Sequence, residues 1–241
     1  MRILAMDSSG LVASVAVVEG GPAESVTVAE YTVNYKKTHS QTLLPMLDEV
    51  SGMIELNIDT IDAIAVAAGP GSFTGLRIGS ATAKGLGLAL KKPLIHVPTL
   101  HGLAYNLCGT GKVVCPIMDA RRGQVYTGIF EFDGNELVVL EDQTAVSIEE
   151  LGAKLAVYDR EIVFLGDGVP VFRKSLEEDI MAGKKISFAP AHLNRQRAAA
   201  VGALGIRYYK EGRLETAGEH QPDYLRVSQA ERERKERMGL D

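Results

Sequence analysis

The chain has 241 residues, 46% hydrophobic and 24% charged, which is typical of a globular protein with one large or two small domains. A net charge of −5 excludes a basic surface over the whole molecule, so any contact with nucleic acid needs a local patch. The two cysteines, Cys108 and Cys115, lack CxxC spacing, which argues against a disulfide framework and favours a reducing compartment.

The hydropathy pattern predicts no membrane span, because the longest apolar run is far too short to cross a bilayer. The opening MRILAMDSSG has a short apolar run that ends at Asp7, which is typical of a first strand and not of a signal peptide. We therefore expect a cytoplasmic protein of bacterial or organellar type.

The first half of the chain alternates between predicted strands and helices. Three strands come first, followed by helix, strand, helix, strand and short helix. The strands are expected at 2–6, 11–18, 25–33, 61–68 and 94–97, and the helices at 39–55, at 99–107 and in the glycine-rich segment ending near 90. An antiparallel meander continued by parallel strands through helical crossovers is the order of a ribonuclease-H-like unit.

After the turn at 109–111 the same order partly repeats. Strands are expected at 113–118, 124–132, 136–141, 161–165 and 185–189, and helices at 147–157, 171–181 and 194–209. Ser147 and Glu150 have the spacing of a capping box at the start of one helix. Two ribonuclease-H-like halves make the α/β, actin-like (ASKHA) fold, which also includes the sugar kinases.

We therefore predict three regions. Residues 1–108 form the first half, completed by the alanine-rich helix at about 194–210. Residues 109–193 form a smaller second half, and residues 211–241 form a polar tail.

The helix at 39–55 has an apolar stripe at helical spacing, and Met46 and Met53 are expected to lie off this stripe. Pro45 lies within the pattern and is expected to start or kink the helix. The stripe consists of Leu43, Leu44, Leu47, Val50 and Ile54.

Small residues recur every four positions in the glycine-rich helix, at Gly75, Gly79, Ala83 and Gly87. We call these four residues the small-residue ridge. Each glycine inside a helix costs about 0.8–1 kcal/mol relative to alanine, so the ridge needs an offsetting gain. That gain is the close approach of another backbone, which belongs either to the underlying sheet or to a helix of another chain.

Two acidic residues follow the first strand of each predicted half, Asp7 and Asp119. Acids at such strand ends could hold Mg²⁺ through water beside a nucleotide, and with Ser8 they make a candidate degenerate nucleotide site. The more favoured interpretation is that each carboxylate closes an Asx turn. The phosphate-binding pattern of actin-like ATPases, Asp with an early Gly and Thr, is incomplete in both halves.

The segment GPGSFTG at 69–75 lies between a strand and a helix, where free backbone N–H groups favour anions. It lacks the Gly-Lys-Ser/Thr of a Walker loop, and Thr74 stands where GxGxxG needs its third glycine. Capping of the helix by Ser72 or Thr74, or an interface role, is favoured over nucleotide binding.

The five histidines contain no i, i+4 pair, and no metal site is expected. No GxSxG elbow supports a hydrolase, and the two cysteines are expected to be packing residues. The basic segment from Arg226 to Met238, with Arg232 and Arg234, is either a solvated helix or a local contact to RNA phosphates or an acidic partner.

Four segments together resemble the TsaB (YeaZ) family, in order and over essentially the whole chain. They are ILAMDSSG, HSQTLLPMLDEV, AAGPGSFTGLRIGSATAKGLGLAL and PDYLRVSQAERE, the third being the most specific. The resemblance implies an actin-like, non-catalytic subunit required for threonylcarbamoyladenosine in tRNAs that read ANN codons. Its implied partners are the catalytic subunit TsaD and the ATPase TsaE, with tRNA as substrate of the complex and TsaC supplying threonylcarbamoyl-adenylate.

The resemblance also implies a homodimer in isolation, formed through the first two helices, and a similar surface for TsaD. TsaD-type catalysts hold a metal with a histidine pair on the helix corresponding to 39–55, whereas this chain has His39 followed by Leu43. We therefore expect no cofactor of its own, with weak ATP or ADP at a partner interface as a candidate. The alternative function is an ATP-dependent phosphotransferase of the sugar-kinase type. The expected interface residues are His39, Leu43, Met46, Leu47, Val50, Gly71, Phe73, Thr74, Gly75, Leu76, Gly79 and Ala83.

Overall fold

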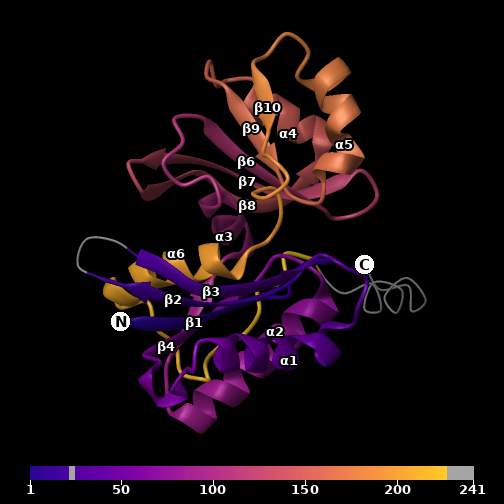
Figure 1. Ribbon diagram of the computed structural model, residues 1–241. Helices are drawn as coiled ribbons and strands as arrows, with labels where there is room; N and C mark the ends of the chain where they lie inside the picture. Colours follow the sequence, from indigo (N-terminus) through magenta and orange to yellow (C-terminus); the bar gives the residue numbers. More distant parts are fainter. Residues whose placement is uncertain (22–24, 227–241) are drawn as a thin grey trace.

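The computed structural model describes residues 1–21 and 25–226, which fold around two five-stranded sheets (Figure 1). The first sheet has the order β3-β2-β1-β4-β5. Its strands are β1 (Arg2–Asp7), β2 (Ala13–Gly20), β3 (Ser25–Val33), β4 (Ala63–Ala67) and β5 (Leu94–Val97). β1, β2 and β3 pair antiparallel, and β4 and β5 extend the sheet in parallel from β1.

The second sheet repeats this topology, with the order β10-β9-β6-β7-β8. Its strands are β6 (Val113–Asp119), β7 (Gln124–Asp133), β8 (Glu136–Ser147), β9 (Ile162–Leu165) and β10 (Ile186–Phe188). β6, β7 and β8 are antiparallel, and β9 and β10 are parallel to β6. The predicted actin-like architecture of two ribonuclease-H-like halves is therefore confirmed. The boundary at residues 108 and 109 stays a prediction.

Helices cover the sheets in layers (Figure 1). Helices α1 and α2 cover the outer face of the first sheet, α6 covers its inner face, and α3 lies between α6 and the second sheet. α4 and α5 belong to the second half. Their bounds are α1 (His39–Met53), α2 (Phe73–Leu90), α3 (Thr99–Tyr105), α4 (Ile148–Leu155), α5 (Val169–Ser175) and α6 (Ala198–Lys210), with short turns at Ile58–Thr60 and Leu176–Ile180.

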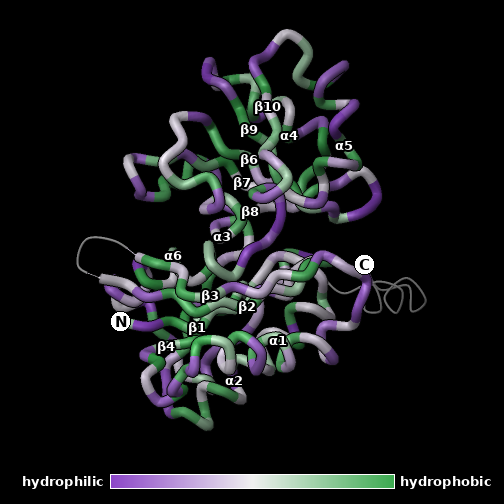
Figure 2. The backbone as a smooth tube through the Cα atoms, in the orientation of Figure 1, coloured by the Kyte–Doolittle hydropathy of each residue, from purple (hydrophilic) through white to green (hydrophobic). Residues whose placement is uncertain are grey.

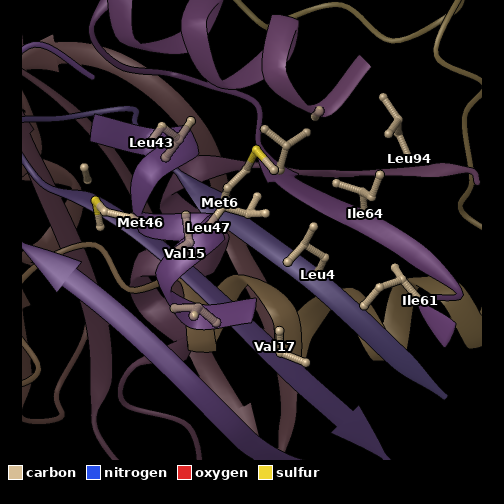
Figure 3. Packing of buried hydrophobic residues seen from close by; sticks show 14 of the residues in the cluster. Leu4, Met6, Val15, Val17, Leu43, Met46, Leu47, Ile61, Ile64 and Leu94 are labelled. Carbon is tan, nitrogen blue, oxygen red and sulfur yellow. The ribbon is translucent and has the colours of Figure 1, made fainter. Parts of the chain in front are cut away.

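Alternate side chains of strand β1 belong to two different hydrophobic cores, one on each face of the first sheet. Leu4 and Met6 point to the α1–α2 side, and Ile3 and Ala5 point to α6. Figure 3 shows Met6 beside Leu43 and Leu47 of α1, and Leu4 in the same cluster toward Ile61 and Ile64. In Figure 2 this strand is coloured as apolar along most of its length, as expected for a strand buried on both faces.

Helix α6 begins four residues later than predicted, at Ala198 and not at 194. Two side chains from the sheet satisfy its first amide groups: Ser14 Oγ accepts from Ala198 N at 2.8 Å, and Glu30 Oε1 accepts from Ala199 N at 3.0 Å. Arg197 is held extended and pairs with Glu30. Capping by residues more than 160 positions away carries no local sequence signal, which explains the error.

The apolar stripe of α1 is centred differently from the prediction. Met46 is buried with Leu43, Leu47 and Val50, whereas Leu44 is 54% exposed. Positions 43, 46, 47 and 50 follow the i, i+3, i+4, i+7 pattern of one helix face, and Leu44 lies about 100° away from Leu43. The expectation that Met46 lies off the buried stripe was therefore wrong.

The capping box at the start of α4 is confirmed. Ser147 Oγ accepts from Glu150 N at 3.1 Å, and Glu150 Oε2 accepts from Ser147 N at 2.8 Å. These hydrogen bonds hold the pKa of Glu150 below its usual range. Among the helices of residues 1–21 and 25–226, none has both the length and the apolar character needed to cross a membrane.

Candidate functional site

A cavity of about 580 Å³ lies where the two halves meet, and we call it the central cleft. Its size is within the range of small-molecule sites. One wall comes from the β1–β2 turn and the start of α2, the other from the ends of β6 and β9. The charged and polar groups that line it include Lys37, His39, Asp119, Arg121, Asp167, Asp223, Tyr224 and Arg226.

Asp119 and Asp167 face each other in the second half's wall. Asp167 Oδ1 accepts from Asp119 N at 3.0 Å, and burial raises the pKa of the Asp167 carboxyl. Asp119 Oδ1 accepts from Arg121 N at 2.8 Å, which is the Asx turn favoured from sequence. Asp119 is the last residue of β6 and Asp167 comes two residues after β9, an equivalence that the sequence order could have indicated.

Asp7 does not line the central cleft. Its side chain is buried, and its Oδ1 accepts from Ser9 N at 2.8 Å and from Ser9 Oγ at 2.6 Å. Burial raises the pKa of this carboxyl, and the Ser9 hydrogen bonds oppose that shift. The Asx-turn interpretation therefore applies to Asp7 too, and the structure separates it from the cleft-lining Asp119.

The glycine loop at 69–75 is packed against the β1–β2 turn. Ser72 N donates to Ser9 O at 2.6 Å, and Ser8 Oγ donates to Gly75 O at 2.9 Å. A Cβ atom at Gly71 or Gly75 would overlap the carbonyl groups of that turn. At Gly75 and Gly79 the small-residue ridge therefore packs on a turn of the same chain, whereas Gly87 faces Leu94 and Lys92. Ser72 caps α2 by accepting from Gly75 N at 3.3 Å.

Most residues expected at a partner interface are buried within this chain, and their interface role stays a prediction. Leu43, Met46, Leu47 and Val50 belong to the core above the first sheet, as Figure 3 shows for the first three. The ridge side of α2 is turned inward as well. Its buried members are Gly75, Leu76, Gly79 and Ala83. A side chain without exposed surface cannot contact a second chain directly.

The remaining expected residues lie at the edge of the central cleft or on the surface. His39 and Gly71 line the cleft, and His39 Nε2 is 2.8 Å from Gly10 O. Phe73 stacks on Tyr224 with ring centroids 4.7 Å apart. Thr74 is exposed on the opposite side of α2 from the ridge.

That opposite side, together with the exposed side of α1, forms a surface that we call the outer helical face. Met53 is 75% exposed and Leu88 is 70% exposed. A Cβ atom at Gly52 or Gly85 would meet no described atom within 4 Å. The small and apolar residues that are exposed on these two helices include Leu44, Gly52, Met53, Thr74, Ala81, Gly85, Leu88 and Ala89, beside the exposed charged residues Asp48, Glu49 and Arg77.

Comparison with known proteins identifies the family. The family model for TsaD, tRNA N6-adenosine threonylcarbamoyltransferase, matches residues 27–234. The tRNA threonylcarbamoyladenosine biosynthesis protein TsaB of Bacillus subtilis (strain 168) is 32% identical over 231 residues, which is 96% of each chain. The chain belongs to the TsaB (YeaZ) family.

Two further relatives agree with this assignment. TsaB of Escherichia coli (strain K12) is 34% identical over 174 residues, which is 71% of each chain. The solved structure of YeaZ from Pseudomonas aeruginosa has a TM-score of 0.75 at 25% identity, covering 93% of this chain and 99% of its own.

The predicted RNA-contact residues divide between described and undescribed parts of this TsaB-family chain. Arg226 Nη1 donates to Ala120 O at 2.7 Å, which ties the end of the described chain to the second half. Arg232 and Arg234 lie outside the described residues.

The tertiary structure also gathers a cluster that sequence reasoning missed. His96, Glu215 and His220 each place a ligand-type atom within 4.8 Å of the others. Burial lowers the pKa of His220, and Glu215 opposes that shift. More than 110 positions separate His96 from the other two residues, so no local motif signals the cluster.

Proposed function

We propose that the chain is a non-catalytic accessory subunit in tRNA threonylcarbamoyladenosine biosynthesis. It binds and stabilises a TsaD-type catalytic subunit together with a TsaE-type ATPase, and tRNA is the substrate of the complex. The observation that carries this proposal is the 32% identity to Bacillus subtilis TsaB over 96% of both chains.

The outer helical face is the proposed docking surface for the TsaD-type subunit. Exposed Met53 and Leu88 provide apolar area, and Gly52 and Gly85 leave room for close approach by another helix. Because this chain itself matches the TsaD family model, we expect a TsaD-type partner to have a related fold and a comparable helix pair. Two related helix pairs can pack around a pseudo-two-fold axis, and in isolation a second copy takes the partner's place.

The test uses Gly85→Leu, which adds bulk on the outer helical face where the chain has open space. We expect the variant to fold normally, to lose its homodimer in light scattering, and to bind the TsaD-type subunit at least about tenfold more weakly, because poor packing costs 1.4 kcal/mol or more. Gly79→Leu is unsuitable, since its Cβ would lie 2.5 Å from Ser8 Oγ and damage the interior.

The matched control is Val157→Arg, a change at a 78% exposed apolar residue in the second half. This variant should retain both the homodimer and partner binding. If Gly85→Leu bound the TsaD-type subunit as tightly as the wild type, the docking surface would lie elsewhere. The accessory role is tested separately, by whether the reconstituted tRNA modification loses activity when this chain is left out.

We further propose that the chain holds no catalytic cofactor of its own and that nucleotide binds weakly, at a partner interface. Calorimetry of the isolated chain with Mg-ATP should give no tight binding. Submicromolar binding that was lost in Asp119→Ala would favour the alternative, an ATP-dependent phosphotransferase using the central cleft. Asp119 is the better variant because Asp7 is buried away from the cleft.

The basic tail is a proposed contact to tRNA within the complex. Deleting the residues after Tyr224 removes Arg226, Arg232 and Arg234 together. We expect the truncated chain to lower the salt-sensitive affinity of the complex for tRNA. An unchanged salt dependence would remove the tail from the RNA-binding surface.

A further inference from the structure

The segment after α6, residues 211–226, returns along the first sheet, and we call it the C-terminal strap. Glu215 pairs with the edge strand β5 through two backbone hydrogen bonds: Leu94 N donates to Glu215 O at 2.8 Å, and Glu215 N donates to Leu94 O at 2.9 Å. This pairing places the Glu215 side chain beside His96, two residues further along β5. The strap then brings His220 to the same place.

Three potential ligand atoms meet at this point. His96 Nδ1 is 3.7 Å from Glu215 Oε1, and His220 Nδ1 is 2.8 Å from Glu215 Oε2. A tetrahedral zinc ion with bonds of about 2.0–2.1 Å separates its ligand atoms by about 3.3 Å. The two distances lie on either side of that value, and the ligand atoms of all three residues lie within 4.8 Å of one another, so small side-chain adjustments would let them converge on one ion.

Asp223 supplies the second feature of a metal site. His96 Nε2 is 2.9 Å from Asp223 Oδ2, so the ring donates its Nε2 proton to that carboxylate. The tautomer leaves the lone pair on Nδ1, which is the atom that faces Glu215. A carboxylate that fixes the far nitrogen of a ligating histidine is the usual outer partner of such a site.

The position of His220 is fixed by its surroundings. Its side chain is fully buried, and its Nε2 has no hydrogen-bond partner among the described residues. Lys84 Nζ donates to His220 O at 3.0 Å, so this ammonium group beside the cluster already has a hydrogen-bond partner. Glu219 caps the turn through Thr216, so it is held away from the other side chains. The ligands are therefore ordered before any ion arrives.

We propose that His96, Glu215 and His220 bind a divalent first-row transition metal, with zinc as the expected ion. Two imidazoles and one carboxylate suit such ions better than Mg²⁺ or Ca²⁺, which prefer all-oxygen ligands. Half-buried Glu215 leaves the fourth position open to water. The site goes beyond the accessory function proposed above and does not depend on it.

The metal would fasten the strap to the sheet next to the central cleft. Asp223 N also donates to Ala68 O at 2.7 Å, and the three residues that follow line the cleft. Occupancy would therefore order the segment that forms one wall of that cleft.

The experiment titrates the untagged, chelator-stripped full chain with Zn²⁺ against a chromophoric competitor. We expect one equivalent to bind, Co²⁺ to give the intense visible absorption of a four-coordinate site, and amide exchange in 215–226 to slow. Glu215→Gln and His96→Gln should each weaken binding at least about 100-fold, and Asp223→Asn about tenfold. His192→Gln, at an exposed histidine elsewhere, should bind as the wild type does.

Thermal unfolding distinguishes the loss of a metal ligand from a failure to fold. Zn²⁺ should raise the melting temperature of the wild type and of His192→Gln, but not that of Glu215→Gln. The proposal is overturned if the wild type binds no stoichiometric metal, if Glu215→Gln and His96→Gln bind as tightly as the wild type, or if His192→Gln loses binding.

Discussion

Helix α2 has two glycine-containing faces with opposite surroundings. On the inner face, the small-residue ridge packs on the β1–β2 turn, and a Cβ atom at Gly79 would lie 2.5 Å from Ser8 Oγ. On the outer face, a Cβ atom at Gly85 would meet no atom within 4 Å in the described parts of the chain. The two glycines are six residues apart in one helix and have the same intrinsic cost.

The difference teaches that glycine spacing alone does not identify an interface. The regular ridge satisfies an internal requirement, because the turn Asp7–Gly10 packs directly on the helix. Atoms of Ser8 lie where Cβ atoms at Gly75 and Gly79 would otherwise be. Gly85, which is outside the four-residue spacing, has no close contact among the described residues that requires a glycine. The described residues offer no offsetting gain for Gly85, which is consistent with the proposed docking surface.

Gly75→Ala is the strongest way to break this comparison. The added methyl group would overlap the carbonyl of Ser8, which is backbone and cannot rotate away. We expect a loss of about 3 kcal/mol in the free energy of unfolding, at the upper end of overpacking effects. Urea unfolding measures this, and Gly85→Ala in the same helix is the matched control. Equal stability of the two variants would show that the ridge is not tightly packed.

Asp7→Asn tests the turn beneath the inner face. Burial raises the pKa of Asp7 above its ordinary value of 3.8, so its contribution to stability is full below pH 3.8 and is lost as the pH rises through the folded-state pKa. The asparagine variant lacks this loss, so its stability relative to the wild type should rise over that pH window. The gain is about 1.4 kcal/mol for each unit of pKa shift.

Denaturant unfolding of both proteins at several pH values from 4 to 7 measures that difference. A stability difference that did not change with pH would contradict the burial of an ionisable Asp7. If Asp7→Asn instead became less stable than the wild type as the pH rose toward 7, the Ser9 hydrogen bonds would be stabilising the ionised carboxylate.

Gly85→Ala is the smallest and most specific prediction. An exposed glycine in a helix interior costs about 0.8–1 kcal/mol relative to alanine, so the isolated chain should gain about that amount. Differential scanning calorimetry below the concentration of dimerisation measures the gain. A loss of stability would mean that this side of α2 has an internal contact after all.

The sequence predicted most of the fold because its signals are local. The order of strands and helices, the turn at Asp7 and the capping box at Ser147 all depend on residues within a few positions of one another. The start of α6 was predicted four residues early because Ser14 and Glu30 cap it from distant strands. The buried face of α1 was misplaced because Leu43 and Leu44 are equally apolar, and only packing selects between them.

The candidate sites show the same limit. Asp119 was found in the central cleft because it ends a strand, whereas Lys37, Asp167 and Tyr224 reach that cleft from separate parts of the chain. The cluster of His96, Glu215 and His220 could not be found from spacing, because the C-terminal strap returns to β5 only in the folded chain.

By itself, the sequence determined the two-part actin-like fold, the family and the existence of a small-residue ridge on α2, because periodicity and motif order are written along the chain. The tertiary structure alone decided which backbone fills that ridge. Close approach depends on where the β1–β2 turn lies in space, and that position follows from the pairing of β1 with both β2 and β4. The ridge therefore packs against the chain's own turn, and the opposite side of the same helix is left exposed.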